Sequence, residues 1–220
     1  MKKWNEINPP YRNELAKSYY DYIKSRKIYR FGKRFFDIVS ALILIILLFL
    51  PSLVIGIVIV CDSRGGAFFC QTRIGRYGKP FKILKFRTMA KNSEGNKLIT
   101  SKDDCRITRV GKFLRKTHFD EFPQLLNVLV GQMSFIGTRP EVKQYVDLYK
   151  DEWYATLFMR PGITSTASYS CDDEAKFISD ENTYDIYLEK ILPYKMNLNL
   201  YDLMHLSFFR DIVILWKTIF

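Results

Sequence analysis

The sequence predicts a mainly helical α+β protein that is anchored in a membrane by one re-entrant, proline-kinked helix. Three observations lead to this prediction. The 24-residue run Ile38–Cys61 contains no charged side chain, and Pro51-Ser52 lies near its middle. Basic residues are concentrated on both sides of this run. The segment that follows has the alternation and glycines of a small β-hairpin, and the remainder has the spacing of amphipathic, partly interfacial helices.

Composition and charge limit the classes of protein and partner. The 220 residues are 48% hydrophobic, which is enough for a packed core and excludes a globally disordered chain. The net charge is +11, and the segment 22–91 alone holds 14 basic residues against two acids. Such an excess calls for an anionic partner, namely nucleic acid, acidic lipid or a phosphorylated substrate. The four cysteines form no metal-binding pattern, which fits a reduced compartment.

The apolar run is long enough to enter a bilayer. As a helix of 24 residues it would measure about 36 Å, compared with about 30 Å for a hydrocarbon core. Basic residues on both flanks favour placing both ends on the cytoplasmic side. Proline kinks a helix, and Ser52 can bond to a carbonyl that Pro51 leaves free. A helix break at Pro51 and Ser52 therefore favours a re-entrant helix, and a kinked single span stays open as the alternative.

The chain is expected to divide into three parts. Residues 1–29 form an N-terminal extension, which is either a helix on the membrane surface or a loosely held segment. No apolar signal-peptide region is expected in this stretch, because its residues are polar and aromatic. Residues 30–62 form the re-entrant membrane helix. Residues 63–220 form a cytoplasmic catalytic domain with a C-terminal helix that is either part of the core or interfacial.

Two short strands are expected directly after the membrane helix. The segments 67–74 and 81–86 have strand-like composition, and Gly75-Arg76-Tyr77-Gly78 joins them. This spacing predicts a hairpin in which both glycines adopt positive φ. Further on, residues 106–131 predict one or two amphipathic helices that end at Gly131.

Asp120 and Glu121 form an acidic pair in the middle of this basic chain. The simplest interpretation is a helix cap, in which Asp120 is the N-cap and Pro123 lies in the first turn. The alternative is a phosphate-handling site, because basic side chains occur in nearby strands and Gly/Pro turns. These are Lys85, Arg87, Arg115, Arg139 and Arg160. Carboxylates among such cations should keep low pKa values, and one could attack phosphorus or help to hold Mg²⁺ on a diphosphate.

The order of these motifs resembles a known family. The basic, proline-broken segment is followed by "GKPFKILKFRTM", then by "RITRVGKFLRKTHFDEFPQLLNVLVGQMSFIGTRPE" and "RPGIT". This pattern resembles the bacterial sugar transferases that are monotopic phosphoglycosyl transferases and prime surface-polysaccharide or glycan synthesis. The resemblance covers about residues 30–166.

The resemblance implies an activity and roles for individual residues. Asp120 would attack the β-phosphate of a UDP-sugar, release UMP and form a phosphosugar intermediate, which undecaprenyl phosphate then accepts. The acidic pair would hold Mg²⁺, and Lys85, Arg87, Arg115 and Arg139 would contact substrate. The family works on the cytoplasmic face of the bacterial inner membrane, among membrane lipids. Nucleic acid is not an expected partner, and the sequence leaves open whether the chain forms a homodimer.

The chain departs from the family pattern in two places. Thr138 stands where a proline is usual, and a common Gly-Trp-Ala-Gln-Val-Asn-Gly-Arg stretch is replaced by "STASYSCDDEAKF" after Thr164. Two other functions remain open from the residues alone. One is a non-catalytic, membrane-anchored protein whose basic surface binds nucleic acid or acidic lipid. The other is a hydrolase of the same diphosphates.

Overall fold

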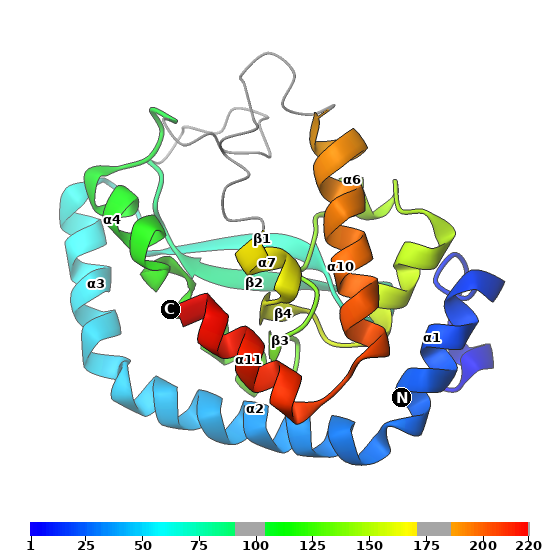
Figure 1. Cartoon of the computed structure of the whole chain (residues 1–220). Coiled ribbons are helices and arrows are strands. Elements are labelled where there is room, and N and C mark those ends of the chain that lie inside the picture. The colour runs from blue at the N-terminus through cyan, green and yellow to red at the C-terminus, as the bar shows by residue number, and fades with distance from the viewer. Residues whose placement is uncertain (91–103, 171–185, 220) are drawn as a thin grey trace.

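The computed structural model describes residues 1–90, 104–170 and 186–219, and its architecture is mainly helical with little sheet, as predicted (Figure 1). Two strand pairs are present in these residues, one antiparallel and one parallel. The α-helices are α1 (Glu14–Ser25), α2 (Lys27–Leu47), α3 (Phe49–Asp62), α4 (Arg109–Thr117), α5 (Gln124–Leu129), α6 (Lys143–Val146), α7 (Thr166–Ser170), α10 (Leu192–Met204) and α11 (Phe208–Ile219). The strands are β1 (Phe68–Ile74), β2 (Pro80–Phe86), β3 (Ser134–Ile136) and β4 (Gly162–Thr164). Shorter 3-10 or π turns are η1 (Trp4–Glu6), η2 (Arg76–Gly78), η3 (Phe119–Glu121), η4 (Asp151–Phe158) and η5 (Tyr187–Ile191).

The predicted break in the apolar run is present between α2 and α3. The two helices meet at Leu48 with a bend of 61°. Pro51 is the third residue of α3, where its missing N–H would otherwise have bonded to the carbonyl of Leu47. The break therefore precedes Pro51 by one turn, because the proline ring clashes with that carbonyl. The backbone N–H of Ser52 bonds to Leu48 at 2.8 Å, whereas no bond of its hydroxyl occurs among the described residues.

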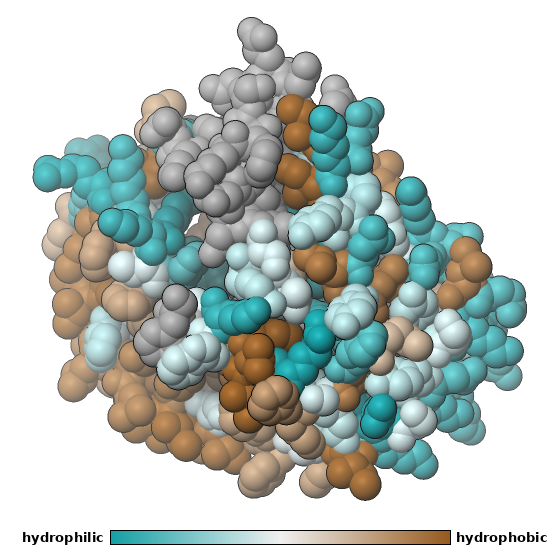
Figure 2. Space-filling view, in the orientation of Figure 1, coloured by the Kyte–Doolittle hydropathy of each residue, from teal (hydrophilic) through white to brown (hydrophobic). Residues whose placement is uncertain are grey.

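By length and composition, no single helix in the described part of the chain could cross a membrane, but the bent pair α2–α3 together could. Most of the large apolar side chains on α2 and α3 are exposed, from Phe31 to Val60. Figure 1 shows the two helices along the outer edge of the molecule, and Figure 2 shows apolar residues gathered there. One face of α2 differs, since Lys33, Asp37 and Ala41, spaced four residues apart, are buried against the rest of the protein.

The N-terminal segment belongs to the main hydrophobic core. Ile7, Tyr20 and Ile23 are at most 1% exposed and lie in one cluster with side chains of η4 and α10. Asn13 caps α1 and also donates from Nδ2 to the carbonyl of Asp151 at 2.8 Å. The expectation of a loosely held extension is therefore wrong, and the apolar face of α1 packs into the protein core; a position at the membrane surface stays a prediction. As a functional division, the parts 1–29, 30–62 and 63–220 remain a prediction.

The β1–β2 hairpin is confirmed, with Ile74 opposite Pro80 at its turn. The expectation that both turn glycines have positive φ is wrong for Gly75, whose φ is −112°. Tyr77 and Gly78 take the left-handed conformation, with φ of 58° and 72°. Gly75 is needed for space instead, because an added Cβ would lie 3.0 Å from the ring of Phe81.

The 106–131 region forms two helices, α4 and α5, separated by the turn η3. Gly131 follows α5 with φ of 88°, as expected for a residue that ends a helix. Asn127 of α5 lies against the hairpin: its amide donates to Lys82 O at 2.8 Å and accepts from Leu84 N–H at 3.1 Å. These two bonds fix the position of β2 relative to α5.

The C-terminal apolar stretch forms two helices that correspond to the two alternatives. α10 is a core helix, with Met196, Leu200 and Leu203 buried. α11 is amphipathic: Ile214 is 3% exposed, while Trp216 is 63% exposed. α11 packs on α2 and on the short β3–β4 pair, so it lies on the same side of the molecule as the bent pair α2–α3.

Candidate active site

The acidic pair lies in the turn η3, between α4 and α5, and not at a helix cap. His118 ends α4 in the left-handed conformation with φ of 57°, which turns the chain sharply before Asp120. The residue that precedes α5 is Pro123, and Asp120 bonds to none of that helix's amides. The capping interpretation is therefore wrong. Asp120 is 8% exposed, so its carboxylate is buried at considerable cost in free energy.

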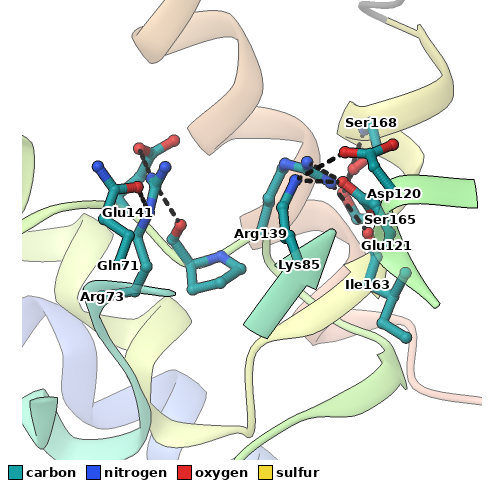
Figure 3. A network of polar contacts seen from close by, with 11 residues as sticks. Gln71, Arg73, Lys85, Asp120, Glu121, Arg139, Glu141, Ile163, Ser165 and Ser168 are labelled. Carbon is teal, nitrogen blue, oxygen red and sulfur yellow. Dashed lines mark hydrogen bonds and ion pairs between the residues drawn. The ribbon is translucent and has the colours of Figure 1, made fainter. Parts of the chain in front are cut away.

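Glu121 is held by two cations from distant parts of the chain. Its Oε1 accepts from Lys85 Nζ at 2.6 Å and from Arg139 Nη2 at 2.5 Å (Figure 3). Burial opposes ionisation of Glu121, but Arg139 and Lys85 outweigh it and hold the pKa of this carboxyl well below its usual range. The expectation of a low pKa is confirmed for Glu121, whose charge is balanced within the site.

The turn that carries Arg139 is clamped to β1. Arg73 Nη1 donates to Pro140 O at 3.2 Å and to Glu141 Oε2 at 3.5 Å, and Ile74 N–H donates to Glu141 O at 2.9 Å (Figure 3). Arg139 Nη1 also donates to Ile163 O of β4 at 3.2 Å. This turn is therefore fixed even though the usual proline before Arg139 is absent. The side chain of Arg139 is 45% exposed, so its guanidinium faces the open side of the site.

Asp120 has a different environment from Glu121. Lys85 Nζ lies 3.9 Å from its Oδ2, and no hydrogen bond to its carboxylate occurs in the part of the chain that the structure describes. Burial raises the pKa of Asp120, and the negative charge of Glu121 raises it further. The positive charge of Lys85 lowers it but does not outweigh burial, so the pKa lies above the ordinary value of an aspartate. The expectation of a low pKa is therefore wrong for Asp120. A buried carboxylate without hydrogen-bond donors is more basic and more nucleophilic than a solvated one.

Arg115 completes the ring of cations. It lies in the last turn of α4, and its Nε donates to Thr88 Oγ1 at 2.9 Å. Its electrostatic attraction to Asp120 lowers the pKa of that carboxyl. α4 approaches closely because Gly111 lies over Thr88, where an added Cβ would be 2.1 Å from the Thr88 carbonyl oxygen.

Comparison with known proteins identifies the family of the chain. A family model described as "Bacterial sugar transferase" matches residues 28–220, which is most of the chain. The chain belongs to the bacterial sugar transferase family.

Three relatives illustrate the breadth of this family. An Aeromonas hydrophila "UDP-N-acetylgalactosamine-undecaprenyl-phosphate N-acetylgalactosaminephosphotransferase" is 36% identical over 200 residues, which is 87% of this chain and 44% of the relative. A Caulobacter vibrioides "UDP-glucose:undecaprenyl-phosphate glucose-1-phosphate transferase" is 44% identical over 140 residues, or 61% of this chain and 52% of the relative. A Bacillus subtilis "Uncharacterized sugar transferase EpsL" is 36% identical over 189 residues, which is 85% of both chains. This sugar transferase therefore spans about half of the first two relatives and most of the third.

Two of the basic residues expected in the site lie elsewhere in this sugar transferase. Arg87 donates from Nη2 to the carbonyl of Ser63 at 2.7 Å and from Nη1 to that of Arg64 at 3.0 Å, so it binds the chain at the carboxyl end of α3. Arg160 donates to Gly131 O at 2.8 Å and lines a separate cavity beside α2. The structure thus brings Lys85, Arg115 and Arg139 to the acidic pair but engages Arg87 and Arg160 in other contacts.

Sequence reasoning also missed residues that surround the pair. Ser165 and Ser168 follow β4 and lie beside Asp120 in Figure 3, with their hydroxyls 3.1 Å apart. Both serines belong to "STASYSCDDEAKF", the segment that differs from the family stretch expected after Thr164. Among the residues that Figure 3 labels, they are the two that come from this segment, and both lie beside the acidic pair. The last part of this segment, residues 171–177, lies outside the described residues.

The donor atoms of the pair suit Mg²⁺ only in part. Within the described residues, no group of three or more His, Cys, Asp or Glu side chains could hold a metal. Oε1 of Glu121 is already bound by two cations, which leaves its second oxygen and the Asp120 carboxylate. One or two carboxylates are the usual protein contribution where Mg²⁺ is shared with a diphosphate. The residues therefore fit an ion that arrives with a phosphorylated substrate.

Proposed function

We propose that this protein transfers a sugar phosphate from a UDP-sugar to undecaprenyl phosphate, releasing UMP, as the first step of polysaccharide or glycan assembly. The observation that carries the proposal is the buried carboxylate of Asp120. It has no hydrogen-bond donor among the described residues, and it lies within a ring of cations beside Glu121, whose Oε1 is bound by two of them. The names of the relatives support a UDP-sugar and undecaprenyl phosphate as substrates.

The chemistry would proceed in two displacements at one phosphorus atom. A carboxylate oxygen of Asp120 attacks the β-phosphorus of the UDP-sugar, and the bond from that phosphorus to the bridging oxygen breaks as UMP departs. A phosphate oxygen of undecaprenyl phosphate then attacks the same phosphorus. The acyl phosphate bond breaks, the Asp120 carboxylate is restored, and an undecaprenyl diphosphate sugar is formed. Two steps allow a soluble and a lipid substrate to use the same site in turn.

The cations would stabilise the charge that develops on the phosphoryl oxygens. Arg139 is partly exposed and presents a planar guanidinium, which can bind two phosphate oxygens. Lys85 lies between the two carboxylates and keeps Glu121 in place while approaching Asp120. Mg²⁺, held by the free carboxylate oxygens of the pair, would neutralise the diphosphate and make UMP a better leaving group.

The bent pair α2–α3 would be a re-entrant anchor in the bacterial inner membrane, with the site on its cytoplasmic face. Support comes from the packing of segments on either side of the anchor. α1 precedes it, yet Tyr19 donates to Glu152 at 2.7 Å and Tyr20 packs on Phe158. A single crossing would place these partners on opposite sides of the bilayer. Exposed apolar side chains on α4, η3 and α5 lie next to the anchor and would face the lipid acceptor; they are Phe113, Phe119, Leu126 and Val130.

The decisive experiment is mass spectrometry of the purified protein after incubation with Mg²⁺ and a panel of UDP-sugars, without lipid acceptor. A mass increase of one sugar phosphate that maps to Asp120 is the expected result. UMP release only after undecaprenyl phosphate is added, without an adduct, would contradict the covalent step and indicate direct transfer. Neither adduct nor UMP, together with nucleic-acid binding that weakens with salt, would favour the non-catalytic alternative.

Mg²⁺ and the nucleotide are expected to bind cooperatively. The protein supplies too few oxygen ligands to hold the ion alone, so Mg²⁺ by itself should leave the melting temperature nearly unchanged. UDP with Mg²⁺ should raise the melting temperature by several degrees more than the sum of the two separate effects. Thermal unfolding of the detergent-purified protein measures this, with Ca²⁺ in place of Mg²⁺ as a control. A large shift with Mg²⁺ alone would contradict the shared-ligand arrangement.

Labelling should place both ends of the anchor on the cytoplasmic side. Single cysteines can be introduced at the exposed positions Arg12 and Lys112, one before and one after the anchor, in a chain whose own cysteines are replaced by serine. A thiol reagent that cannot cross membranes should label neither position in intact cells and both after permeabilisation. Labelling of one position from outside would mean that α2–α3 crosses the membrane.

A further inference from the structure

A second basic site lies apart from the acidic pair. A cavity of about 280 Å³ opens between α2 and the chain around β3 and β4. Six basic residues and one acid line it, together with Phe31, Ser134 and Met159; the charged residues are Lys27, Arg30, Lys33, Arg34, Asp37, Arg76 and Arg160. Ser134 and Arg160 lie at the start of β3 and just before β4, whereas the catalytic contacts lie beyond the ends of these strands. Within the described residues, none of the side chains that line the cavity forms an ion pair or hydrogen bond with Asp120 or Glu121, so the two sites are distinct.

The carboxylates near the cavity are already engaged. Asp37 is 2% exposed and accepts from Ser134 Oγ at 3.0 Å and from Phe135 N–H at 3.1 Å. Lys33 is ion-paired with Asp211 at 2.8 Å. Asp37 and the Lys33–Asp211 pair therefore form a structural link between α2, β3 and α11. Their charges sum to −1, whereas the other five basic residues that line the cavity contribute +5, so the cavity remains strongly positive.

In the described residues the four arginines donate hydrogen bonds to neutral groups, and Asp37 is the one carboxylate that lines the cavity with them. Arg34 donates to two carbonyls at the end of α5, at 2.7 and 2.9 Å. Arg76 donates to Phe158 O at 2.9 Å, Arg160 to Gly131 O at 2.8 Å, and Arg30 to Lys24 O at 3.3 Å. Carbonyls orient a guanidinium but do not neutralise it.

The arrangement costs free energy unless an anion is bound. Burial lowers the pKa of Arg160, and the like charges of Arg76 and Arg34 lower it further. Nε of Arg30 is buried and has no hydrogen-bond partner in the described part of the chain. Concentrated, partly buried guanidiniums with unused donors are the usual receptor for phosphate oxygens.

From this geometry we propose that the cavity binds a phosphate group, at a site that is separate from Asp120 and does not depend on its chemistry. The rim favours the head group of an anionic lipid over a soluble phosphate. Phe31 lines the opening and is 78% exposed, and Phe35, one turn further along α2, is 65% exposed. The cavity therefore opens beside exposed apolar side chains of α2, so a bound phosphate could keep its acyl chains on that face.

The test is a titration of the full-length protein in neutral detergent with phosphatidylglycerol, and separately with inorganic phosphate, followed by native mass spectrometry. Lys27→Gln/Arg30→Gln removes two charges from the cavity and disturbs few internal contacts. We expect the affinity for phosphatidylglycerol to fall about tenfold, because two charge-assisted contacts are lost. The matched control Arg12→Gln/Lys17→Gln removes two exposed charges and should bind as the unchanged protein does.

Each outcome decides the proposal. Arg30→Lys keeps the charge and should retain most of the affinity, which separates loss of a phosphate contact from loss of folding. A tenfold loss for inorganic phosphate with no loss for phosphatidylglycerol would retain the site but overturn the lipid as its ligand. Equal affinities of all variants for both probes would overturn the site. None of these results depends on turnover, so failure here is distinct from failure of the proposed transferase reaction.

Discussion

Replacing Asp120 by asparagine is expected to reduce turnover by at least about a thousandfold, because the amide cannot act as the nucleophile. The sugar-phosphate adduct should be absent from the same variant in the mass spectrum. Asparagine is close to aspartate in size, so Glu121 should keep its contacts with Lys85 and Arg139. Loss of activity should therefore occur in a folded protein that still associates with membranes.

The stability of Asp120→Asn should reveal the cost of the buried charge. The folded pKa of Asp120 is raised, so this residue favours the folded state below its unfolded pKa of about 3.9, and the contribution is lost as pH rises through the folded pKa. At pH 7 the charge thus opposes folding, and Asp120→Asn should melt at the same temperature as the unchanged protein or higher. The raised pKa also predicts that turnover declines on acidification from a higher pH than an ordinary aspartate would give.

The matched control is Asp21→Asn, which removes an exposed carboxylate from α1 and should change neither turnover nor melting temperature. Turnover of Asp120→Asn within tenfold of the unchanged protein would show that another group forms the intermediate. A melting temperature many degrees lower would show instead that Asp120 is mainly structural.

Replacing Gly162 by alanine is expected to destabilise the protein by about 3 kcal/mol or more, which is at the upper end of the range for overpacking. An added Cβ would lie 2.2 Å from the nitrogen and 2.4 Å from the oxygen of Gly137. These are backbone atoms of the residue that directly follows β3, and they cannot rotate away as a side chain would. The same strand pair also carries the bond from Gly162 N–H to Thr138 O at 3.0 Å, one residue before Arg139.

Activity should fall together with stability in Gly162→Ala, because separation of β3 from β4 would move Arg139 away from Glu121. Thermal unfolding and the UMP-release assay measure the two effects. Gly66→Ala is the control, since nothing lies within 4 Å of a Cβ added there. If both alanine variants melted alike, the close approach of β3 and β4 would not be needed for folding.

Features set by local chemistry could be predicted from the sequence. The bend near Pro51 follows from one missing hydrogen bond and one clash, and the hairpin follows from a four-residue turn between two strand-like segments. Even in this turn, Gly75 does not have the expected positive φ, and its lack of a Cβ matters because the ring of Phe81 lies close to it. Lys85, Arg115 and Arg139 were placed with the acidic pair through the family resemblance, and the structure brings them together.

Features that depend on long-range geometry could not be predicted. The sequence gives no sign that His118 adopts a left-handed conformation, and this turn is what removes Asp120 from the cap of α5. Arg87 and Arg160 resembled phosphate ligands, but each binds carbonyls whose position depends on how α3 and α5 pack. Asn127 bonds to residues more than 40 positions away, and only an amide inside an apolar helix could have indicated a special role.

The core shared by the segments before and after the bent pair α2–α3 has a consequence for the order of assembly during synthesis. Asn13 and its partner Asp151 are 138 residues apart along the chain, so α2 and α3 leave the ribosome long before the elements that complete the core around α1. During that interval the most apolar part of the protein has no folded domain beside it. Insertion of the bent pair into lipid would therefore come first, and by holding residues 26 and 63 near the same surface it would shorten the effective loop that the later core contacts must close.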